Sequence, residues 1–513
     1  MRLAELEPAA PDQIDLGGKR LLIFIVAYNA ETTIEKVLNR IPQSLATAGD
    51  VEILIIDDFS RDDTFVSGLR YQQRDSVFKI TVLRTPENQG YGGNQKLGYR
   101  YAIDHGFDIV ALVHGDGQYA PEELPKLLGP LVRNEADAVF GSRMIDKKGA
   151  RQGGMPLYKW IGNQVLTAFQ NRVLGTRLSE FHTGYRLYST AALAKVPFEK
   201  NTNDFHFDTE IIIQFVLGKL HIAELPIPTF YGDEVCHVNG MKYAWDVFKS
   251  TVKARLCGIH LFYDRKFDVN PGPGSHSDKL SFSSSQTFAV ESCAAGQNVL
   301  QLGIGHGNVA AALEGRGCRV NVIDFAANEL AENSNAIHSA ASPSLPTNLP
   351  AYEQILLMDL IEHLHDPETF MDALRRETAG RRPEVIITSA NVAFFVTRIM
   401  LALGQFNYSR KGILGIGHRR LFTFKSLRAL LEQAGYEVLE ARGVPAPFPL
   451  AIGTNIWSKV LLKVNELLLK ISPGLFAYQV CIRARALPDA RHLLKETISG
   501  SAKLRSELLG RVA

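Results

Sequence analysis

Short runs of apolar residues alternate with longer amphipathic stretches along most of the chain. In the first half, apolar runs occupy residues 21–26, 51–56, 80–83, 109–113 and 138–140. Unbroken apolar runs of this length are typical of parallel strands that are covered on both faces. The stretches between them, such as 32–41 and 62–74, have helical periodicity, and the Pro-Glu-Glu at 121–123 is typical of a helix start. The pattern predicts an α/β fold with right-handed crossovers.

A second alternating pattern follows, with strands predicted at 298–302, 319–323, 354–358, 385–388 and 478–483. The two patterns are separated by residues 263–286, whose proline, glycine and serine content is typical of a linker. A chain of 513 residues is also long enough for more than one domain. We therefore predict domains at 19–262 and 287–486, a linker at 263–286, a flexible tail at 1–18 and a C-terminal tail at 487–513. Both domains are expected to be α/β.

The composition of the chain indicates which binding partners and which cellular compartment to expect. Lys and Arg total 56 against 54 acids, a formal charge of +2, which does not favour nucleic acid as a partner. Five scattered cysteines without a Cys-x-x-Cys pair predict neither a disulfide framework nor a zinc site, and favour a reducing cytosol. The first eighteen residues do not resemble a secretory leader, and no apolar run approaches the roughly 20 residues that span a bilayer. We expect a cytoplasmic protein, with contact at the cytosolic face of a membrane left open.

Polar residues follow three predicted strands of the first half. Tyr28 follows the first strand, Asp58 the second, and Gly115, Asp116 and Gln118 the fourth. Ligands of open parallel sheets bind beyond the carboxyl ends of the strands, so we expect these residues to converge. An aromatic face, a carboxylate and a cation bound by oxygen ligands are what a nucleoside diphosphate needs, and glycine lets the backbone approach phosphates closely. The pattern predicts a nucleotide site with a divalent cation.

The stretches that carry these residues resemble a known family. They are similar to the family-2 inverting glycosyltransferases of the GT-A fold, especially the branch that includes dolichol-phosphate mannose synthase. The resemblance spans residues 20–260 and rests on 26–29, 55–60, 88–93, 114–121, 141–143 and 183–187. It implies a nucleotide-sugar donor with Mg²⁺ or Mn²⁺, Asp58 on the nucleoside, Asp116 and Gln118 on the metal and phosphates, and Arg143 on the phosphates. His114 stands where the family often has another aspartate, which leaves the metal to Asp116 and Gln118.

The acceptor side of this site has two interpretations. A hydroxyl acceptor needs a general base, and Asp208 is the candidate. A phosphate acceptor, such as a polyprenyl phosphate, is already anionic and needs no base, and Asp208 would then cap the helix expected at 209–217. Arg186 is predicted to contact an acceptor phosphate or the departing diphosphate, with a structural ion pair as the alternative. A glycan acceptor fits the first interpretation.

The second half carries a separate glycine loop after its first strand. Gly303, Gly305 and Gly307 form the loop, and Asp324 ends the next strand, where a ribose-binding carboxylate is usual. Spacing alone leaves NAD open as the cofactor. The motif at 357–367 and the segments 421–427 and 431–436, however, resemble class I S-adenosylmethionine-dependent methyltransferases over residues 285–485.

The resemblance implies a Rossmann-like fold with S-adenosylmethionine as cofactor. It places Gly303 and Gly305 at the methionine end of the cofactor, Asp324 on the ribose, and Asp359 beside the adenine or the sulfonium. An acid commonly occupies the position of Gln301, so a degenerate binding or scaffolding module is the alternative to an active enzyme. Methyl transfer depends mainly on positioning, but a base helps a hydroxyl or amine acceptor. His363 and His418 are candidates, and structural histidines are the alternative for both.

Apolar residues recur at helical spacing over 456–471, with lysines between them and Trp457 near the start. Such a stripe is typical of a helix that faces the core or another subunit, and it also fits a helix resting on an anionic membrane. Taken together, the chain is predicted to be a bifunctional enzyme that transfers a sugar and a methyl group. The resemblances place it in the assembly of surface polysaccharides or glycolipids.

Overall fold

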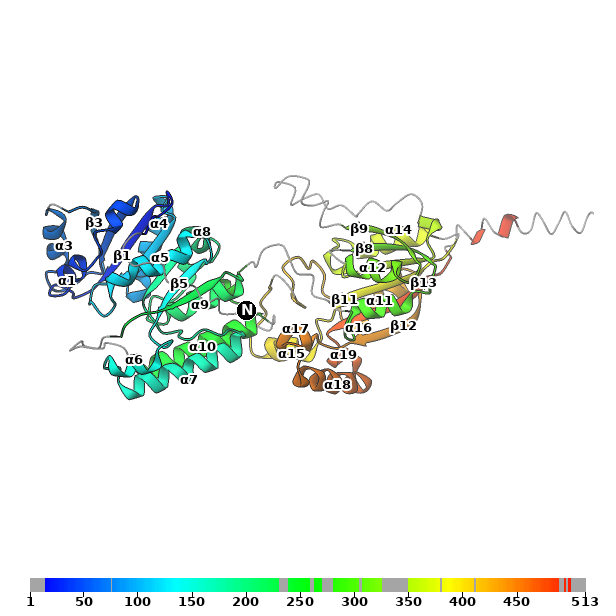
Figure 1. Ribbon diagram of the computed structural model, residues 1–513. Coiled ribbons are helices and arrows are strands. Elements are labelled where there is room, and N and C mark those ends of the chain that lie inside the picture. Colours follow the sequence, from blue (N-terminus) through cyan, green and yellow to red (C-terminus); the bar gives the residue numbers. More distant parts are fainter. Residues whose placement is uncertain are drawn as a thin grey trace, which may run out of the picture. The chain divides into compact units, whose positions relative to one another are not determined.

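The computed structural model describes most of the 513-residue chain. The described residues are 14–74, 76–229, 239–258, 263–269, 280–303, 307–324, 349–378, 381–409, 412–488, 493–494 and 497–499. The chain divides into two compact units, Met1–Pro273 and Gly274–Ala513, which are described separately (Figure 1). Much of the predicted linker, 270–279, lies outside the described residues, and the finer boundaries predicted from the sequence stay predictions.

The first unit is built on a seven-stranded sheet with the order β3-β2-β1-β4-β6-β5-β7. Its strands are β1 (Leu21–Ala27), β2 (Val51–Asp57), β3 (Lys79–Arg84), β4 (Ile109–His114), β5 (Ala138–Ser142), β6 (Arg186–Ser189) and β7 (Ile222–Pro226). β6 runs antiparallel to β4 and β5, and the remaining neighbours are parallel. The five strands predicted in this half are all present, and β6 and β7 were not predicted.

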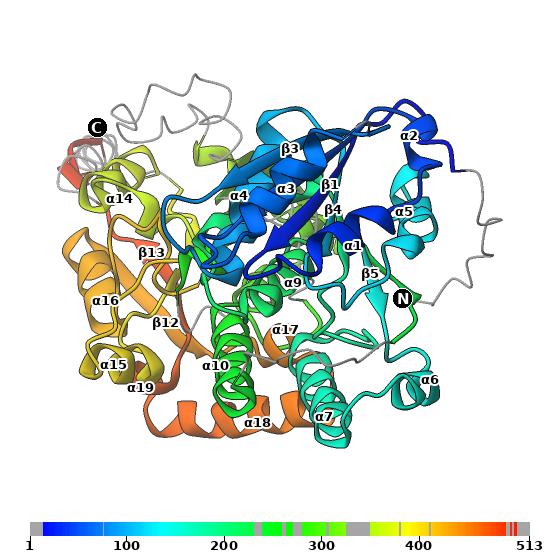
Figure 2. The ribbon, with the colours of Figure 1, turned by 90° about the vertical axis from the view of Figure 1, so that its left-hand side faces the viewer.

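Helices cover both faces of this sheet (Figure 2). Successive residues of β1 point to opposite faces. Ile23 and Ile25 pack on the face covered by helices at 34–39 and 124–132, and Leu22 and Phe24 on the face covered by helices at 91–104 and 207–217. Burial on both faces is the reason that the strands read as unbroken apolar runs. The helical segments are α1 (Ile34–Asn39), α2 (Leu45–Ala48), α3 (Thr64–Gln72), α4 (Tyr91–Asp104), η1 (Pro121–Glu123), α5 (Leu124–Val132), α6 (Lys147–Gln152), α7 (Leu157–Leu174), α8 (Thr190–Leu193), η2 (Phe198–Lys200), α9 (Phe207–Leu217), α10 (Gly240–Gly258) and η3 (Arg265–Phe267).

The second unit is built on a six-stranded sheet with the order β12-β13-β11-β10-β8-β9. Its strands are β8 (Asn298–Gly303), β9 (Arg319–Asp324), β10 (Gln354–Met358), β11 (Glu384–Ala390), β12 (Tyr436–Val444) and β13 (Gln479–Ala486). β8 to β11 are parallel, and β13 runs antiparallel to both β11 and β12. The five strands predicted in this half are present, and β12 was not predicted. The α/β class is confirmed for both units.

Helices of the second unit surround this sheet and extend beyond one end of it. They are α11 (Ser285–Ser292), α12 (Gly307–Glu314), η4 (Leu349–Ala351), η5 (Ile361–His363), α14 (Pro367–Glu377), α15 (Phe395–Ala402), α16 (Phe424–Gln433), α17 (Phe448–Ile452), α18 (Ile456–Ile471) and α19 (Pro473–Phe476). Within the described ranges of the whole chain, no helix combines the length and the apolar character that crossing a bilayer requires.

Candidate functional site

The carboxyl ends of β2, β1 and β4 lie side by side in the first unit. In the register of the sheet, Val26 of β1 is paired with Ile56 of β2 on one side and with His114 of β4 on the other. The residues that follow these strands therefore share one edge of the sheet, which is where ligands of open parallel sheets bind. Tyr28, predicted to face the nucleotide base, has 47% of its surface exposed there.

Asp116 occupies a loop that is held tightly against β1. The amide of Gly115 donates to the Val26 carbonyl at 2.9 Å, and a Cβ at Gly115 would lie 3.1 Å from that same oxygen. The Asp116 carboxylate is exposed and accepts the Gln118 amide at 3.0 Å, across a glycine with a φ of +78°. A carboxylate and an amide oxygen, completed by phosphate oxygens and water, are suitable ligands for Mg²⁺ or Mn²⁺.

Asp58 is buried, and its carboxylate is used to order a neighbouring loop. It accepts the backbone amides of Gln89 at 2.8 Å and Gly90 at 2.9 Å, and the hydroxyl of Thr85 at 3.2 Å. Burial raises the pKa of Asp58, although these hydrogen bonds favour the charged form. Asp58 therefore positions the segment that leads into α4, and its predicted contact with the nucleoside stays a prediction.

Arg143 is oriented by a buried acid that the sequence analysis did not single out. The Glu180 carboxylate pairs with the Arg143 guanidinium and accepts the Arg143 amide at 2.8 Å, while Nη2 of Arg143 donates to the His182 carbonyl at 3.0 Å. Burial would raise the pKa of Glu180, but the adjacent guanidinium outweighs it and lowers that pKa. Glu180 and His182 therefore orient the guanidinium, and the predicted contact of Arg143 with the phosphates stays a prediction.

Arg186 and Asp208 form the centre of a buried polar network. Nη1 of Arg186 lies 3.0 Å from Oδ1 of Asp208, and the arginine side chain has no exposed surface. The Asp208 carboxylate also accepts the Tyr91 hydroxyl and the Gln95 amide, each at 3.0 Å. Arg186 thus matches the structural ion pair rather than a phosphate contact, and Asp208 is not a helix cap. With three donors on its carboxylate, Asp208 is better suited to positioning its neighbours than to accepting a proton.

A group that could hold a metal ion is formed by the segment before α9 and by α10. Asp204, His206 and Asp246 place one potential ligand atom each within 4.8 Å of one another. Asp204 also pairs with Lys242 at 2.9 Å, and this contact lowers the pKa of Asp204. The lysine competes directly with any cation, so the group remains secondary to Asp116 as a metal site.

In the second unit, Asp359 follows β10 at the carboxyl edge of the sheet. It adopts a left-handed φ of +47°, and its Oδ1 accepts the Thr388 hydroxyl at 2.8 Å and the Gln479 amide at 3.0 Å. Thr388 belongs to β11 and Gln479 to β13, so three strands fix the position of this carboxylate. A carboxylate held in this way at the strand ends suits the cofactor role predicted for Asp359.

Glu362 and two histidines gather close to Asp359. The rings of His363 and His418 meet edge to face with centroids 4.9 Å apart, although 54 residues separate them in the sequence of 513. The Glu362 carbonyl accepts the amides of Arg419 and Arg420, which holds the His418 segment beside it. Burial, followed by the charge of Asp359, raises the pKa of Glu362 to about 8. The sequence motif contained Glu362, but its burial was not visible in the pattern.

The remaining cofactor residues are described only in part. Gly303 ends β8 and is buried, and Gly307 begins α12, whereas Gly305 lies outside the described residues. Asp324 ends β9, and its side chain also lies outside the described part. Gln301 is buried within β8, with a register that places it opposite Leu356 and Val322. These positions agree with a loop between the first strand and helix of a nucleotide-binding fold.

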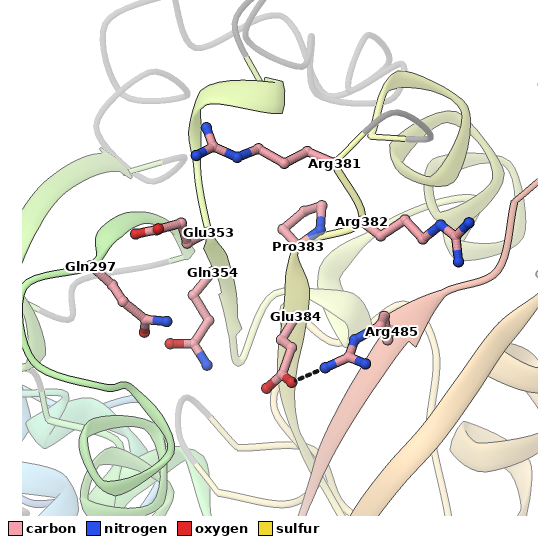
Figure 3. Close-up of a pocket in the computed structure, with 8 residues that line it drawn as sticks. All are labelled: Gln297, Glu353, Gln354, Arg381, Arg382, Pro383, Glu384 and Arg485. Carbon is pink, nitrogen blue, oxygen red and sulfur yellow. Dashed lines mark hydrogen bonds and ion pairs between the residues drawn. The ribbon is translucent and has the colours of Figure 1, made fainter.

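A cavity of about 450 Å³ lies at the opposite edge of this sheet, where β8, β10 and β11 begin (Figure 3). Arg485 and Glu384 form an ion pair at 2.5 Å on its wall. Its lining consists of Gln297, Glu353, Gln354, Arg381, Arg382, Pro383, Glu384 and Arg485. Because cofactors of such folds bind at the carboxyl ends of the strands, this cavity is separate from the predicted cofactor site.

Both units match models of known protein families. Residues 22–196 match the family described as glycosyl transferase family 2, and residues 278–441 match a methyltransferase domain. The first match contains the ends of β1, β2 and β4, and the second contains Asp359 and Glu362. The chain therefore carries a family 2 glycosyltransferase domain followed by a methyltransferase domain, and both are domains of transferase enzymes. The two resemblances predicted from the sequence are confirmed.

Relatives of the first unit act on lipid phosphates, according to their names. A UDP-N-acetylglucosamine–dolichyl-phosphate N-acetylglucosaminyltransferase of Methanococcus voltae is 28% identical over 42% of this chain and 88% of its own length. An undecaprenyl-phosphate mannosyltransferase of Micrococcus luteus is 27% identical over 40% of this chain and 82% of its own. A polyprenol monophosphomannose synthase of Mycolicibacterium smegmatis is 23% identical over 41% and 77%. Each match covers a length comparable to the first unit alone.

Among solved structures, glucosyl-3-phosphoglycerate synthase of Mycobacterium tuberculosis is similar over 46% of this chain and 79% of its own. Its sequence is 18% identical, and the TM-score is 0.34. The family assignment accordingly rests on the sequence matches.

Proposed function

We propose that the first unit transfers a sugar, with inversion, from a nucleotide-sugar donor to a polyprenyl phosphate, and that the second transfers a methyl group from S-adenosylmethionine. The observation that carries the first part is the exposed carboxylate of Asp116 at the end of β4, next to the ends of β1 and β2. Asp116 and Gln118 would hold Mg²⁺ or Mn²⁺, which neutralises the charge of the departing nucleoside diphosphate.

The polar network around Asp208 supports a phosphate acceptor. In the proposed reaction an acceptor phosphate oxygen forms the new bond to the anomeric carbon, and the bond from that carbon to the donor diphosphate breaks. The acceptor is already anionic, so no proton has to be removed. Asp208, which already accepts hydrogen bonds from Tyr91 and Gln95 and pairs with Arg186, would then serve as a positioning residue. The acceptors named for the relatives support the same choice.

Two helices of the first unit offer a surface for the lipid part of such an acceptor. α7 and α10 lie side by side (Figure 1). The rings of Phe169 and Phe248 stack between them, with centroids 5.1 Å apart. Tyr158, Met241 and Trp245 on these helices remain largely exposed, with 70%, 84% and 58% of their surfaces accessible. Exposed aromatic and apolar side chains of this kind favour contact with a membrane, which we place at the cytosolic face.

In the second unit, the proposed methyl transfer rests on the carboxyl edge of β8 to β11. The loop after β8 and Asp324 would bind S-adenosylmethionine, Asp359 would lie beside it, and Glu362 with the histidine pair would face the methyl acceptor. A degenerate module that binds or scaffolds without catalysis is the second candidate, and the buried Gln301, in place of a common acid, favours it. We further propose that both reactions serve surface polysaccharide or glycolipid assembly.

The proposal is tested by incubating the full chain with a panel of radiolabelled nucleotide sugars, Mn²⁺ and a polyprenyl phosphate in detergent. One donor is expected to label the lipid, and Asp116→Asn is expected to abolish that transfer. Asp104→Asn, which alters an exposed acid at the far end of α4, is the matched control and should keep the wild-type rate. Transfer that is unaffected by Asp116→Asn would exclude the proposed metal site.

A further inference from the structure

Helix α18 turns a broad apolar side outward, and its buried residues are the polar Ser458 and Asn465. Ser458 and Asn465 are buried against the second unit, whereas Ile456, Trp457 and Leu467 have 73%, 66% and 61% of their surfaces exposed. A helix on the surface of a globular domain normally shows the reverse arrangement, because its apolar stripe faces the core. Of the interpretations left open by the sequence, the core-facing one does not fit this arrangement within the described part of the unit, and the subunit-facing and membrane-facing ones both remain.

Hydrogen bonds fix this orientation of the helix. Asn465 accepts the Ala446 amide at 2.8 Å and donates to the Phe476 carbonyl at 3.0 Å, which ties α18 to the segments on both sides of it. At its start, the Asn455 side chain accepts the Ser458 amide at 2.9 Å in a capping box. Rotating the apolar side inward would turn Asn465 away from these segments and leave the Ala446 amide and the Phe476 carbonyl without this partner, which has a cost.

The exposed apolar residues form one continuous surface, which we call the α18 face. At 100° per residue they fall within an arc of about 140° on the helix. The α18 face consists of Ile456, Trp457, Val460, Leu461, Val464, Leu467 and Ile471. Along one margin of it, three exposed lysines follow one another: Lys459, Lys463 and Lys470. Apolar residues bordered by lysines are typical of helices that lie in the interface of a membrane.

Neighbouring helices extend the exposed apolar surface. α15 contacts α19 through Phe395 and Phe476, whose ring centroids lie 5.8 Å apart, and α17, α18 and α19 follow one another in the same part of the second unit (Figure 1). Ile399 and Leu401 of α15 and Leu450 of α17 are exposed by 54%, 58% and 43%. Apolar exposure concentrated in one region marks an interaction site rather than scattered surface residues.

We propose that the α18 face docks on an anionic lipid bilayer, with the helix lying in the plane of the membrane. The 16 residues of α18 reach only about 24 Å, which is shorter than the apolar core of a bilayer, so the helix is suited to lying on the surface. Trp457 would sit among the headgroups, and the lysines would attract acidic lipids. Three lysines against one glutamate, Glu466, leave the helix with a charge of +2, which favours anionic lipid over a second copy of the same face.

The docking of the second unit deepens the proposed function, since it would hold the methyltransferase at the membrane of the lipid acceptor. Only this biological role of the docking, which is to bring the methyltransferase to the lipid acceptor, rests on the proposed function. The contact itself is derived from the α18 face, and its test requires neither a donor sugar, nor a metal ion, nor S-adenosylmethionine. Failure of membrane docking and failure of the sugar-transfer proposal can therefore be told apart.

The test measures sedimentation of the full chain with vesicles of phosphatidylcholine alone and with about 30% phosphatidylglycerol. Wild-type protein is expected to prefer the anionic vesicles and to dissociate from them at high salt. Leu467→Glu is expected to weaken partitioning about tenfold or more, since it places a charge in the apolar face. Val77→Glu introduces the same charge at an apolar residue of the first unit that is 64% exposed, and it should bind as wild type.

A second variant, Lys459→Gln with Lys463→Gln, keeps the apolar face and is expected to lose the preference for anionic vesicles. Circular dichroism and sedimentation velocity of each variant establish its folding and oligomeric state. The proposal is overturned if wild type does not bind anionic vesicles, or if both variants bind as wild type does. It is equally overturned if Leu467→Glu only turns a dimer into a monomer and leaves vesicle binding unchanged, because the face would then be a subunit interface.

Discussion

The guanidinium of Arg186 and the carboxylate of Asp208 form a buried ion pair at 3.0 Å, between strand β6 and the first turn of α9. Two further donors, from Tyr91 and Gln95 of α4, complete the bonding of the carboxylate. The pair therefore joins three elements that are distant in sequence, next to the edge of the sheet where the donor is proposed to bind.

Replacing the positively charged side chain of this pair, Arg186, is expected to destabilise the first unit strongly. Arg186→Met leaves a buried carboxylate without its counter-charge, which typically costs about 3–5 kcal/mol. Hydrogen exchange of the β4 and β6 amides under native conditions measures the change in that unit alone. Arg100→Met is the matched control, because Arg100 pairs with Glu199 in solvent, where such pairs contribute at most about 1 kcal/mol. Equal effects of the two substitutions would contradict the role of the buried pair.

Gly184 is expected to be required for the position of His114. A Cβ at residue 184 would lie 2.7 Å from the His114 ring and 3.1 Å from the Tyr119 ring. Gly184→Ala should therefore displace His114 at the end of β4, at a cost of about 1–3 kcal/mol, and lower the rate of sugar transfer. In contrast, a Cβ at Gly162 in α7 meets no atom within 4 Å, so Gly162→Ala should stabilise the helix by roughly 0.5–1 kcal/mol. Thermal melting and transfer rates compare the two variants.

The buried acid Glu362 is expected to make the stability of the second unit dependent on pH. Burial raises its pKa to about 8, whereas an unfolded glutamate titrates near 4.5, so the native state holds an extra proton between these values. The stabilisation is complete below about pH 4.5 and is lost as the pH rises towards 8. Glu362→Gln stays neutral throughout and should show a smaller decline of stability over this window.

Melting curves of the second unit at several pH values, recorded for wild type and Glu362→Gln, measure this effect. Glu368→Gln is the control, because Glu368 is an exposed acid that pairs with Arg420 on the surface. If wild type and Glu362→Gln decline in parallel from pH 5 to pH 8, the raised pKa of Glu362 is refuted.

Asp324 is expected to bind the ribose of S-adenosylmethionine. Hydrogen bonds to a charged group contribute about 1.5–3 kcal/mol, so Asp324→Ala should weaken cofactor binding by roughly one to two orders of magnitude. Titration calorimetry measures the affinity, and Asp372→Ala, at an exposed acid of α14, serves as control. Binding that is unchanged in Asp324→Ala would remove support for the cofactor site, and no binding to wild type would favour the scaffolding alternative.

The strands that are buried on both faces could be predicted, because such strands appear in the sequence as unbroken runs of apolar residues. β12 could not, since it is an edge strand that carries Glu437, Glu440 and Arg442, and only half of its pattern is apolar. β6 was missed for a related reason. It is four residues long and begins with Arg186, a charged residue whose burial depends on Asp208, 22 positions later.

In the candidate site, too, features set by neighbouring residues could be predicted, whereas features set by contacts between distant segments could not. Tyr28, Asp58 and Asp116 were predictable because each lies within two residues of the end of a strand, and parallel strands end at one edge. The pairing of Arg143 with Glu180, and the meeting of His363 with His418, depend on tertiary packing between distant segments and leave no periodic signal. The orientation of α18 was likewise not predictable, because periodicity shows that a helix has an apolar side but not what that side faces.

The central claim is that Asp116 holds a divalent cation that binds the diphosphate of a nucleotide sugar. The most direct measurement is thermal stabilisation of the full chain by nucleotide sugars, with and without Mn²⁺, in wild type, Asp116→Asn and the control Asp104→Asn. A donor at 100 times its Kd should stabilise wild type and the control by about 2.7 kcal/mol, only when Mn²⁺ is present. Metal-dependent stabilisation that persists undiminished in Asp116→Asn would contradict the claim.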